Sequence, residues 1–188
     1  NNIKFNEISN LDVDLKDFLF IIENRKVSIT KSCHTDCFPH NFQFYNSSSF
    51  NGILNYVKNT NTNLISIRVS STNPRAKNNL PENIINYNDD ESSFCTKDQP
   101  NQWICIDFKH HTVIPQYYSI RTFNAQSNFS HLRSWVIEGS NNNFNWTILD
   151  YKSNCSHLNG PKHYHSYPIY NPNNNSFRYL RILQTDLN

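Results

Sequence analysis

The chain has 188 residues and a formal net charge of +2. Its thirteen Phe, ten Tyr and three Trp are enough large apolar side chains to build a hydrophobic core. A domain of about 150 residues buries roughly 68–70% of its unfolded surface, so this length suffices for one stable core plus an extension. The small net charge is spread along the chain, which argues against the clustered basic face of a nucleic-acid-binding protein. No apolar run approaches the roughly 18 residues that indicate a membrane-spanning helix.

The first predicted element is a β-hairpin within an N-terminal arm, residues 1–39. Two apolar runs, 17–22 and 26–30, flank the loop Glu23-Asn24-Arg25. A lone hairpin is marginal in water, so we expect the arm to pack on the rest of the chain. Cys33, Cys37 and His40 follow and could ligate zinc. A closed zinc site needs four ligands, and no second Cys pair stands at the usual distance, so a polar linker with ordinary thiols is the favoured interpretation.

Residues 40–188 form the predicted main domain, and their short apolar runs predict an all-β fold. A short helix is expected over 51–58, because Ile53, Leu54 and Val57 recur at helical spacing. The prolines at both ends of 73–81 indicate a loop. Strands rich in β-branched and aromatic residues are expected at 64–69, 102–108, 117–123, 134–140, 146–150 and 177–185. We expect the three tryptophans, in or beside these strands, to be largely buried: Trp103, Trp135 and Trp146.

Four of these segments resemble a known family. "QWICIDF", "YSIRTF", "SWVIEGSNNNFNW" and "FRYLRILQT" stand in the order seen in discoidin, or F5/8 type C, domains. The resemblance covers about residues 42–187, and the segment from Trp135 to Trp146 is its most specific part. It implies a galactose-binding-like jelly-roll β-sandwich that binds ligands through loops at one end and performs no catalysis. Residues 16–29, "KDFLFIIENRKVSI", also resemble the opening hairpin of a BTB domain, which would suggest a BTB-associated intracellular protein of the protist type.

The resemblance also implies a candidate structural calcium site. In discoidin domains an Asp-initiated loop before the "QWICIDF"-type strand often holds calcium, and here Asp89 and Ser93 match that pattern. Calcium takes six to eight oxygen ligands from carboxylates, hydroxyls and carbonyls. Asp90 stands where the family usually has Gly, and the alternative is a solvated turn. No other cofactor is implied.

The family's jelly roll closes with one more strand after the "FRYLRILQT" type, and no such strand follows in this sequence. We therefore expect the strand at 177–185 to present an edge whose backbone groups need a partner. The missing strand would come from residues 1–8, which alternate apolar and polar side chains, from a partner chain, or from a following segment outside this sequence.

Candidate ligand-binding residues lie in two late loops, 124–133 and 151–165. These loops are rich in His and Tyr, which can bind a peptide, a sugar or a metal, although ordinary loop chemistry is the plain alternative. The residues selected are Asn124, His131, Arg133, His157, His163 and Tyr164.

Catalysis is not predicted. The chain contains no GxSxG, HExxH or phosphate-binding loop motif. Glu138 and Asp150 could be imagined as the paired carboxylates of a glycosidase, but nothing in the sequence sets an acid against a base.

The five cysteines, an odd number, point to the cytoplasm. At least one thiol is unpaired within the chain, and free thiols favour a reducing compartment. Cys105 lies between two isoleucines and is expected to be a small buried hydrophobe. Five Asn-x-Ser/Thr sites occur, about the number expected by chance in this Asn-rich chain, so they do not indicate secretion.

The leading functional prediction is a non-catalytic module of an intracellular protein that binds a protein partner or a small ligand through loops at one end of the sandwich. The first alternative is a structural component of a large cytoskeletal or flagellar, microtubule-associated assembly. The second alternative is a secreted, glycan-binding lectin of the discoidin type. The Asn, Ser and His at the loop tips argue against lipid binding.

Overall fold

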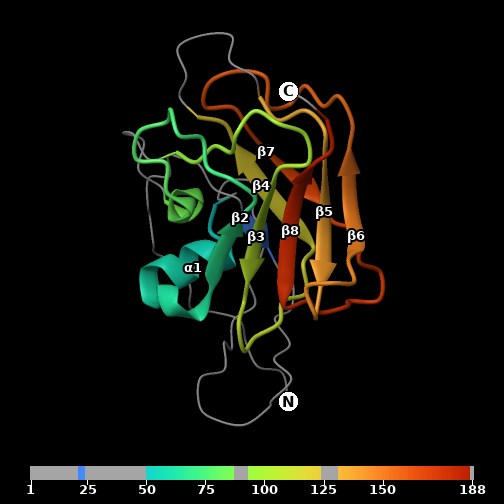
Figure 1. Cartoon of the computed structure of the whole chain (residues 1–188). Coiled ribbons are helices and arrows are strands. Elements are labelled where there is room, and N and C mark those ends of the chain that lie inside the picture. Colours follow the sequence, from blue (N-terminus) through green and yellow to red (C-terminus); the bar gives the residue numbers. More distant parts are fainter. Residues whose placement is uncertain (1–20, 24–49, 87–92, 124–130, 187–188) are drawn as a thin grey trace, which may run out of the picture.

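A computed structural model describes residues 21–23, 50–86, 93–123 and 131–186, and Figure 1 shows two antiparallel sheets facing each other. The larger sheet has five strands in the order β2 (Ser66–Val69), β3 (Trp103–Asp107), β8 (Tyr179–Gln184), β5 (Trp135–Ser140) and β6 (Thr147–Lys152). The smaller sheet has three, in the order β1 (Ile21–Glu23), β4 (Tyr117–Arg121) and β7 (Tyr164–Pro168). The predicted β-sandwich is confirmed.

Within the part of the chain that the structure describes, three short helices accompany the sheets: α1 (Ile53–Thr60), η2 (Thr62–Leu64) and η3 (Pro81–Ile85). The predicted spacing of Ile53, Leu54 and Val57 explains how α1 packs, because all three side chains are at most 1% exposed. The helix lies beside β2 (Figure 1) and extends the core past the edge of the larger sheet. None of the helices among the described residues is long and apolar enough to span a membrane.

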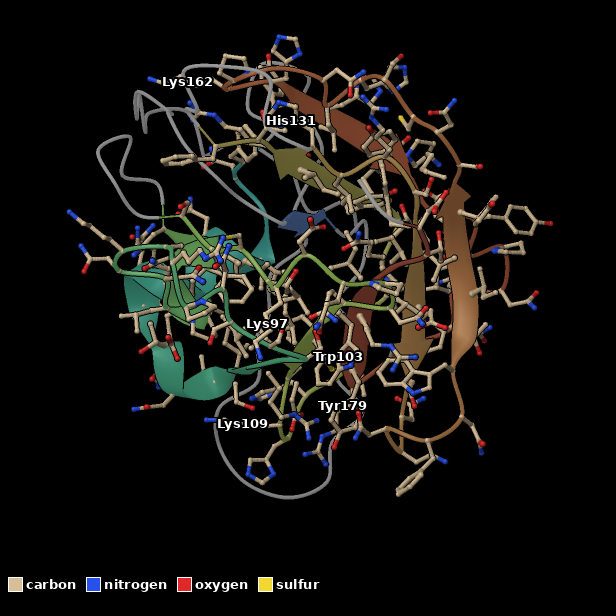
Figure 2. All side chains as sticks on the ribbon, turned by 45° about the horizontal axis from the view of Figure 1, so that its top comes forward. Lys97, Trp103, Lys109, His131, Lys162 and Tyr179 are labelled. Atoms are coloured by element: carbon tan, nitrogen blue, oxygen red, sulfur yellow. The ribbon has the colours of Figure 1, made fainter. Side chains whose placement is uncertain are left out.

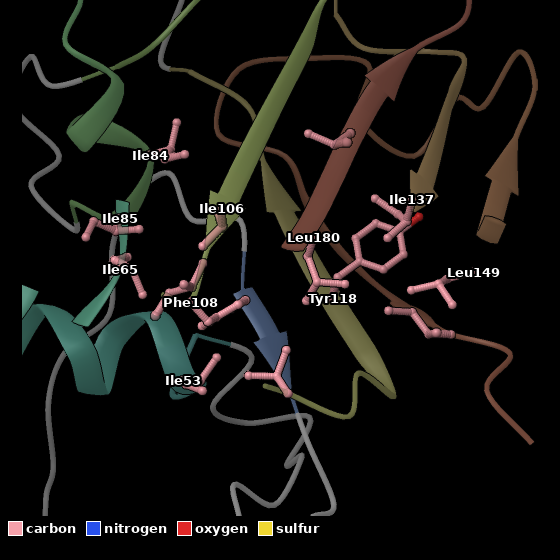
Figure 3. Close-up of a cluster of buried hydrophobic side chains, with 14 of the residues drawn as sticks. Ile53, Ile65, Ile84, Ile85, Ile106, Phe108, Tyr118, Ile137, Leu149 and Leu180 are labelled. Carbon is pink, nitrogen blue, oxygen red and sulfur yellow. The ribbon is translucent and has the colours of Figure 1, made fainter. Parts of the chain in front are cut away.

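The core lies between the two sheets. Figure 3 shows Ile106, Ile137 and Leu180 of the larger sheet facing Tyr118 of the smaller one. Successive side chains in a strand point to opposite faces, so alternate residues of each strand fill this space. Gly139 also lies on the inner side of β5, where a Cβ atom would stand 2.5 Å from the Phe177 ring, so a larger residue would displace that ring.

The same alternation corrects the prediction for the tryptophans. Trp135 points inward and is 0% exposed, as expected. Trp103 is only half-buried, because Ile104 and Ile106 take the inner positions of β3. Trp146 is also half-buried, with its ring against Arg181 on the outer side of the larger sheet.

The prediction of an unpaired edge at residues 177–185 is wrong. β8 lies between β3 and β5 and pairs with both, from Trp103↔Leu183 on one side to Trp135↔Gln184 on the other. Its local pattern identifies it as a strand but does not reveal its neighbours, which come from distant parts of the chain. The predicted closing segment, residues 1–8, lies outside the described residues.

Part of the predicted arm does join the sandwich. β1 pairs antiparallel with β4, with Ile21 opposite Ser119 and Glu23 opposite Tyr117. The expected packing of the arm on the main domain therefore holds for these residues. The second run of the predicted hairpin, 26–30, and the boundary between arm and main domain near residue 39 lie outside the described residues, so both stay predictions.

Candidate functional site

Two connections meet at the upper end of the sandwich in Figure 1. They join β4 to β5 and β6 to β7, and they are hydrogen-bonded to each other. The Cys155 backbone N–H donates to the Arg133 carbonyl at 2.8 Å, and the Asn154 N–H donates to Ser134 Oγ at 3.1 Å. Thr122 and His163 are linked in the same way, by a 2.8 Å bond from the Thr122 N–H to the His163 carbonyl. These bonds fix the two connections to each other beside the strand ends.

We call this region the histidine end, defined by His131, His157, His163 and His165. His157 is exposed, and its ring stacks on the half-buried His165 ring, with centroids 4.0 Å apart and 25° between the planes. The His165 ring in turn contacts Tyr167, at 4.6 Å between centroids. One face of the His157 ring is thus covered by protein.

Like charges surround the histidines. Burial, followed by the charges of His157 and Lys152, lowers the pKa of His165 below its usual 6.5. Burial, followed by the charges of His163 and Arg133, likewise lowers the pKa of His131. Both effects disfavour the protonated form, because a buried or positively flanked imidazolium is poorly solvated and repelled. His131 and His165 are therefore mostly neutral at pH 7.

A buried polar chain supports the histidine end from below. Trp135 Nε1 donates to the Tyr118 hydroxyl at 2.8 Å, and that hydroxyl donates to Asp150 Oδ2 at 2.5 Å. Lys152 Nζ pairs with both oxygens of Asp150 at 2.5 Å. Burial and then the Asp150 carboxylate raise the pKa of Tyr118 far above the neutral range, so its phenol stays protonated. We call Trp135, Tyr118 and Asp150, with Tyr167 stacked on Tyr118, the polar floor.

The structure brings together four of the six residues selected from the sequence: His131, Arg133, His157 and His163. Tyr164 points the other way, because it alternates with His165 and Tyr167 along β7, and its ring meets Phe50 edge-on at 5.6 Å. Asn124 lies outside the described residues. Figure 2 shows His131 and Lys162 at this end, away from Trp103 and Tyr179 on the larger sheet.

Two contributing residues were not selected from the sequence: His165 and Lys152. The predicted loop 151–165 contains them, but β6 continues to Lys152 and β7 begins at Tyr164. The sequence did hold one signal. His163, His165 and Tyr167 recur at every second residue, which in a strand places them on the same face.

The calcium prediction remains untested. Asp89 lies outside the described residues, and so do the zinc candidates Cys33, Cys37 and His40. Ser93 is described, and its backbone carbonyl accepts a 3.0 Å hydrogen bond from Asn83 Nδ2. Within the described ranges, no three His, Cys, Asp or Glu side chains are grouped so that they could hold a metal ion.

Glu138 and Asp150, the carboxylates considered for a glycosidase, lie on opposite sides of the larger sheet. Asp150 faces inward to Tyr118 of the smaller sheet. Glu138 faces outward, where Arg181 Nε donates to it at 2.8 Å. Two carboxylates in this arrangement cannot flank one glycosidic bond.

The outer face of the larger sheet carries a paired network of charges. Arg178 binds Asp107 with two hydrogen bonds, 2.8 and 3.1 Å long, and its guanidinium lies 4.7 Å from the Tyr179 ring centroid. Arg181 pairs with Glu138 and lies 4.0 Å from the Trp146 centroid. Cys105 lies beneath this network at 2% exposure, and burial raises the pKa of its thiol to about 11. The predicted burial of Cys105 is confirmed.

No protein-family model matches the chain, and a comparison with curated proteins finds no significant relative. Solved structures do match. The CpGH89CBM32-5 module from Clostridium perfringens, in complex with GalNAc-β-1,3-galactose, aligns with a TM-score of 0.53 at 8% identity over 66% of this chain and 86% of the module. The lectin domain of lectinolysin, complexed with Lewis B antigen, aligns at 0.51 with 15% identity over 65% of this chain and 83% of that domain.

The fold is a discoidin-type, galactose-binding-like jelly roll. The jelly roll also matches part of a Ruminococcus gnavus GH29 fucosidase solved in complex with fucose, with a TM-score of 0.50 and 20% identity over 74% of this chain and 25% of the enzyme. At these identities the similarity establishes the fold alone. The proposed kinship with BTB-associated proteins stays a prediction.

Proposed function

We propose that the chain is a non-catalytic carbohydrate-binding module and that the histidine end is its binding surface. The observation that carries the proposal is the His157–His165 stack: an exposed imidazole held at 4.0 Å on a second one, above the polar floor. The similar solved structures that contain GalNAc-β-1,3-galactose or Lewis B antigen support it, because they share this jelly roll. What those proteins bind is carried to this chain only as part of the proposal.

The chemistry of the stack suits a sugar ring. A pyranose has an apolar C–H face, which packs on flat rings, and hydroxyl groups, which need donors and acceptors. Each neutral imidazole offers one N–H donor and one nitrogen acceptor. His157, His163 and His131 are held by connections that are hydrogen-bonded to a rigid sandwich, the usual arrangement for a recognition site.

A protein partner is the second candidate, as the sequence first suggested. Edge strand β6 favours it, because Ile148 and Tyr151 are 63% and 58% exposed on the outer face, and Phe144 in the preceding turn is 85% exposed. Exposed apolar side chains along a sheet edge are typical of contact surfaces. A cytoplasmic location, with the cytoskeleton or flagellum as the specific setting, belongs to this second candidate.

The test is a binding screen with the whole chain. Neutral and acidic oligosaccharides, including galactose-, GalNAc- and fucose-containing ones, are titrated and followed by calorimetry. We expect saturable binding to at least one, weakened about tenfold or more in His157→Ala. The matched control is His110→Ala, which removes an exposed histidine in the β3–β4 connection at the opposite end and should leave affinity unchanged. Failure of every sugar to bind, or equal losses in both variants, would contradict the proposal.

A further inference from the structure

The β6–β7 connection contains an asparagine followed by a glycine, Asn159-Gly160. This pair is prone to deamidation, because glycine has no side chain to keep its backbone nitrogen away from the carbonyl carbon of the asparagine side chain. The only other such pair in the sequence is Asn51-Gly52, directly before α1. The two pairs have the same covalent chemistry, so a difference in their reactivity has to come from the fold.

The fold requires glycine at position 160. Gly160 has a φ of +135°, a backbone conformation that residues with a side chain rarely adopt. A Cβ atom at this position would lie 2.7 Å from His163 Nε2 and 2.8 Å from His163 Cε1. A larger residue would therefore be strained and would also displace the imidazole. The structure thus explains why Asn159 is followed by the one residue that makes it reactive.

Both reacting groups of this pair are accessible. Asn159 is exposed, and its side-chain amide makes no hydrogen bond within the described part of the chain. Its backbone N–H donates to the Ser156 carbonyl at 3.1 Å. The Gly160 carbonyl accepts a 2.5 Å bond from Thr122 Oγ1, but the Gly160 N–H, the attacking group, donates to no acceptor among the described residues. No hydrogen bond has to break before these two groups meet.

The other pair is protected by its place at the start of α1. Asn51 Oδ1 accepts a 3.2 Å hydrogen bond from Asn55 Nδ2, one turn along the chain. Gly52 is buried, and its carbonyl accepts a 3.1 Å bond from the Tyr56 N–H at the beginning of the helix. The side chain and the peptide unit are therefore both held, and reaction at this pair requires local opening of the helix.

We propose that Asn159 is a site of spontaneous deamidation, through which the histidine end changes its charge as the protein ages. The Gly160 nitrogen bonds to the Cγ carbon of Asn159 and gives up its proton. That carbon releases the side-chain nitrogen as ammonia, which leaves a cyclic succinimide. Water then adds to either carbonyl of the ring and opens it, giving aspartate or isoaspartate. The sequence needs only water and involves no oxidation or reduction.

Both products alter the connection. The new carboxylate stands two residues after His157 and four residues before His163 in the sequence. In the isoaspartyl product the backbone also runs through the former side chain. This adds a carbon atom before Gly160 and moves its carbonyl relative to Thr122 Oγ1. The inference goes beyond the proposed function, because it concerns the connection whether or not a sugar binds there.

The test follows both pairs in the whole chain. The protein is kept under mildly alkaline conditions in water labelled with heavy oxygen, then digested, and the peptides that contain Asn159 and Asn51 are quantified by mass spectrometry. We expect the Asn159 peptide to take up label about tenfold faster than the Asn51 peptide, because the second pair reacts only after local opening. The matched control is the chain in denaturant, where both pairs should react at similar rates.

One variant and three outcomes decide the inference. Asn159→Gln, whose longer side chain closes the ring far more slowly, should abolish label uptake at 159 and leave uptake at Asn51 unchanged. Equal rates at the two pairs in the folded chain, or faster reaction at Asn51, would overturn the inference. Unreacted Asn159 in the folded chain, after a period in which the denatured chain has reacted, would also overturn it. These measurements contain no sugar, so their failure leaves the proposed function standing, and failure of the sugar screen leaves this inference standing.

Discussion

The outer face of the larger sheet and the histidine end both gather charged and aromatic side chains, but they treat charge in opposite ways. On the outer face, Asp107 and Glu138 are each held by an arginine. Those arginines also lie on aromatic rings, Arg178 on Tyr179 and Arg181 on Trp146. At the histidine end, by contrast, imidazoles stand next to one another, next to Arg133, and next to Lys152, which is itself paired with Asp150.

Under the proposed function, this difference separates a surface that contributes stability from one that binds a ligand. A paired charge has its electrostatic requirement satisfied within the fold, so an incoming molecule gains little by approaching it. A group of like-charged or chargeable side chains is destabilised by mutual repulsion, and an opposite charge that binds there relieves this repulsion. The comparison therefore predicts that variants of the two regions affect different properties, stability for the outer face and binding for the histidine end.

The largest expected effect comes from the polar floor. Trp135→Ala should lower the free energy of unfolding by about 3–5 kcal/mol, because it empties a fully buried site and leaves the Tyr118 hydroxyl without its donor. Trp146→Ala on the outer face is the matched control and should cost about 1 kcal/mol or less, since its ring is half-exposed and contacts Arg181. Chemical denaturation measures the unfolding free energy of both variants. Equal losses would contradict the placement of Trp135 in the core and of Trp146 on the outer face.

An intermediate effect is expected on the outer face. Glu138→Gln removes the charge that pairs with Arg181, and the unfolding free energy should fall by about 1–2 kcal/mol. Sugar affinity should not change, because Glu138 points away from the polar floor. If Glu138→Gln kept native stability but changed sugar affinity, the outer face and the histidine end would not have the separate roles described above.

The smallest effect is a difference in pH dependence. His131 and His165 have pKa values below 6.5 in the folded chain, so the unfolded chain binds protons more readily than the folded one near that pH. Their contribution is therefore fully present above about pH 6.5 and is lost as the pH falls toward the folded pKa values. His165→Gln should flatten the stability profile in this window, as measured by denaturation at a series of pH values. If the slope of stability against pH is the same in His165→Gln as in the unmodified chain, the half-buried, positively flanked position of His165 is wrong.

The outer face should respond at lower pH. Burial opposes ionisation of Asp107, but the bonds from Arg178 and from the Lys109 N–H outweigh it and lower the pKa below 3.8. Asp107 therefore contributes stability above about pH 3.8, and this contribution disappears as the pH falls through the pKa of the folded state. Asp107→Asn should remove that acidic step and leave the step near neutrality unchanged. Loss of both steps would show that the two regions are not independent.

The sequence predicted where the strands lie along the chain better than which strands pair with each other. β3, β4, β5 and β8 each lie within the apolar runs expected, because alternation is written in consecutive residues. The central place of β8 was missed, because pairing with β3 and β5 joins segments far apart in the chain. β7 was missed for another reason: its inner face carries His165 as well as Tyr167, so its apolar pattern is weak.

The candidate site was predictable by residue type but not by grouping. The abundance of His in two loops indicated His131, His157 and His163. The His157–His165 stack and the opposite direction of Tyr164 follow from where β7 begins and from its register with β4. Those features are set by contacts between distant segments, which no local pattern contains.

The most direct test of the account is to map a bound sugar on the whole chain by backbone amide NMR. An oligosaccharide found in the screen is added stepwise, and the amide shifts are followed. We expect the changes to concentrate in 131–134 and 153–165, at the histidine end, and the opposite end, 109–116 and 169–178, to remain unchanged. Changes centred on the opposite end, or along edge strand β6, would contradict the central claim that the histidine end is the binding surface.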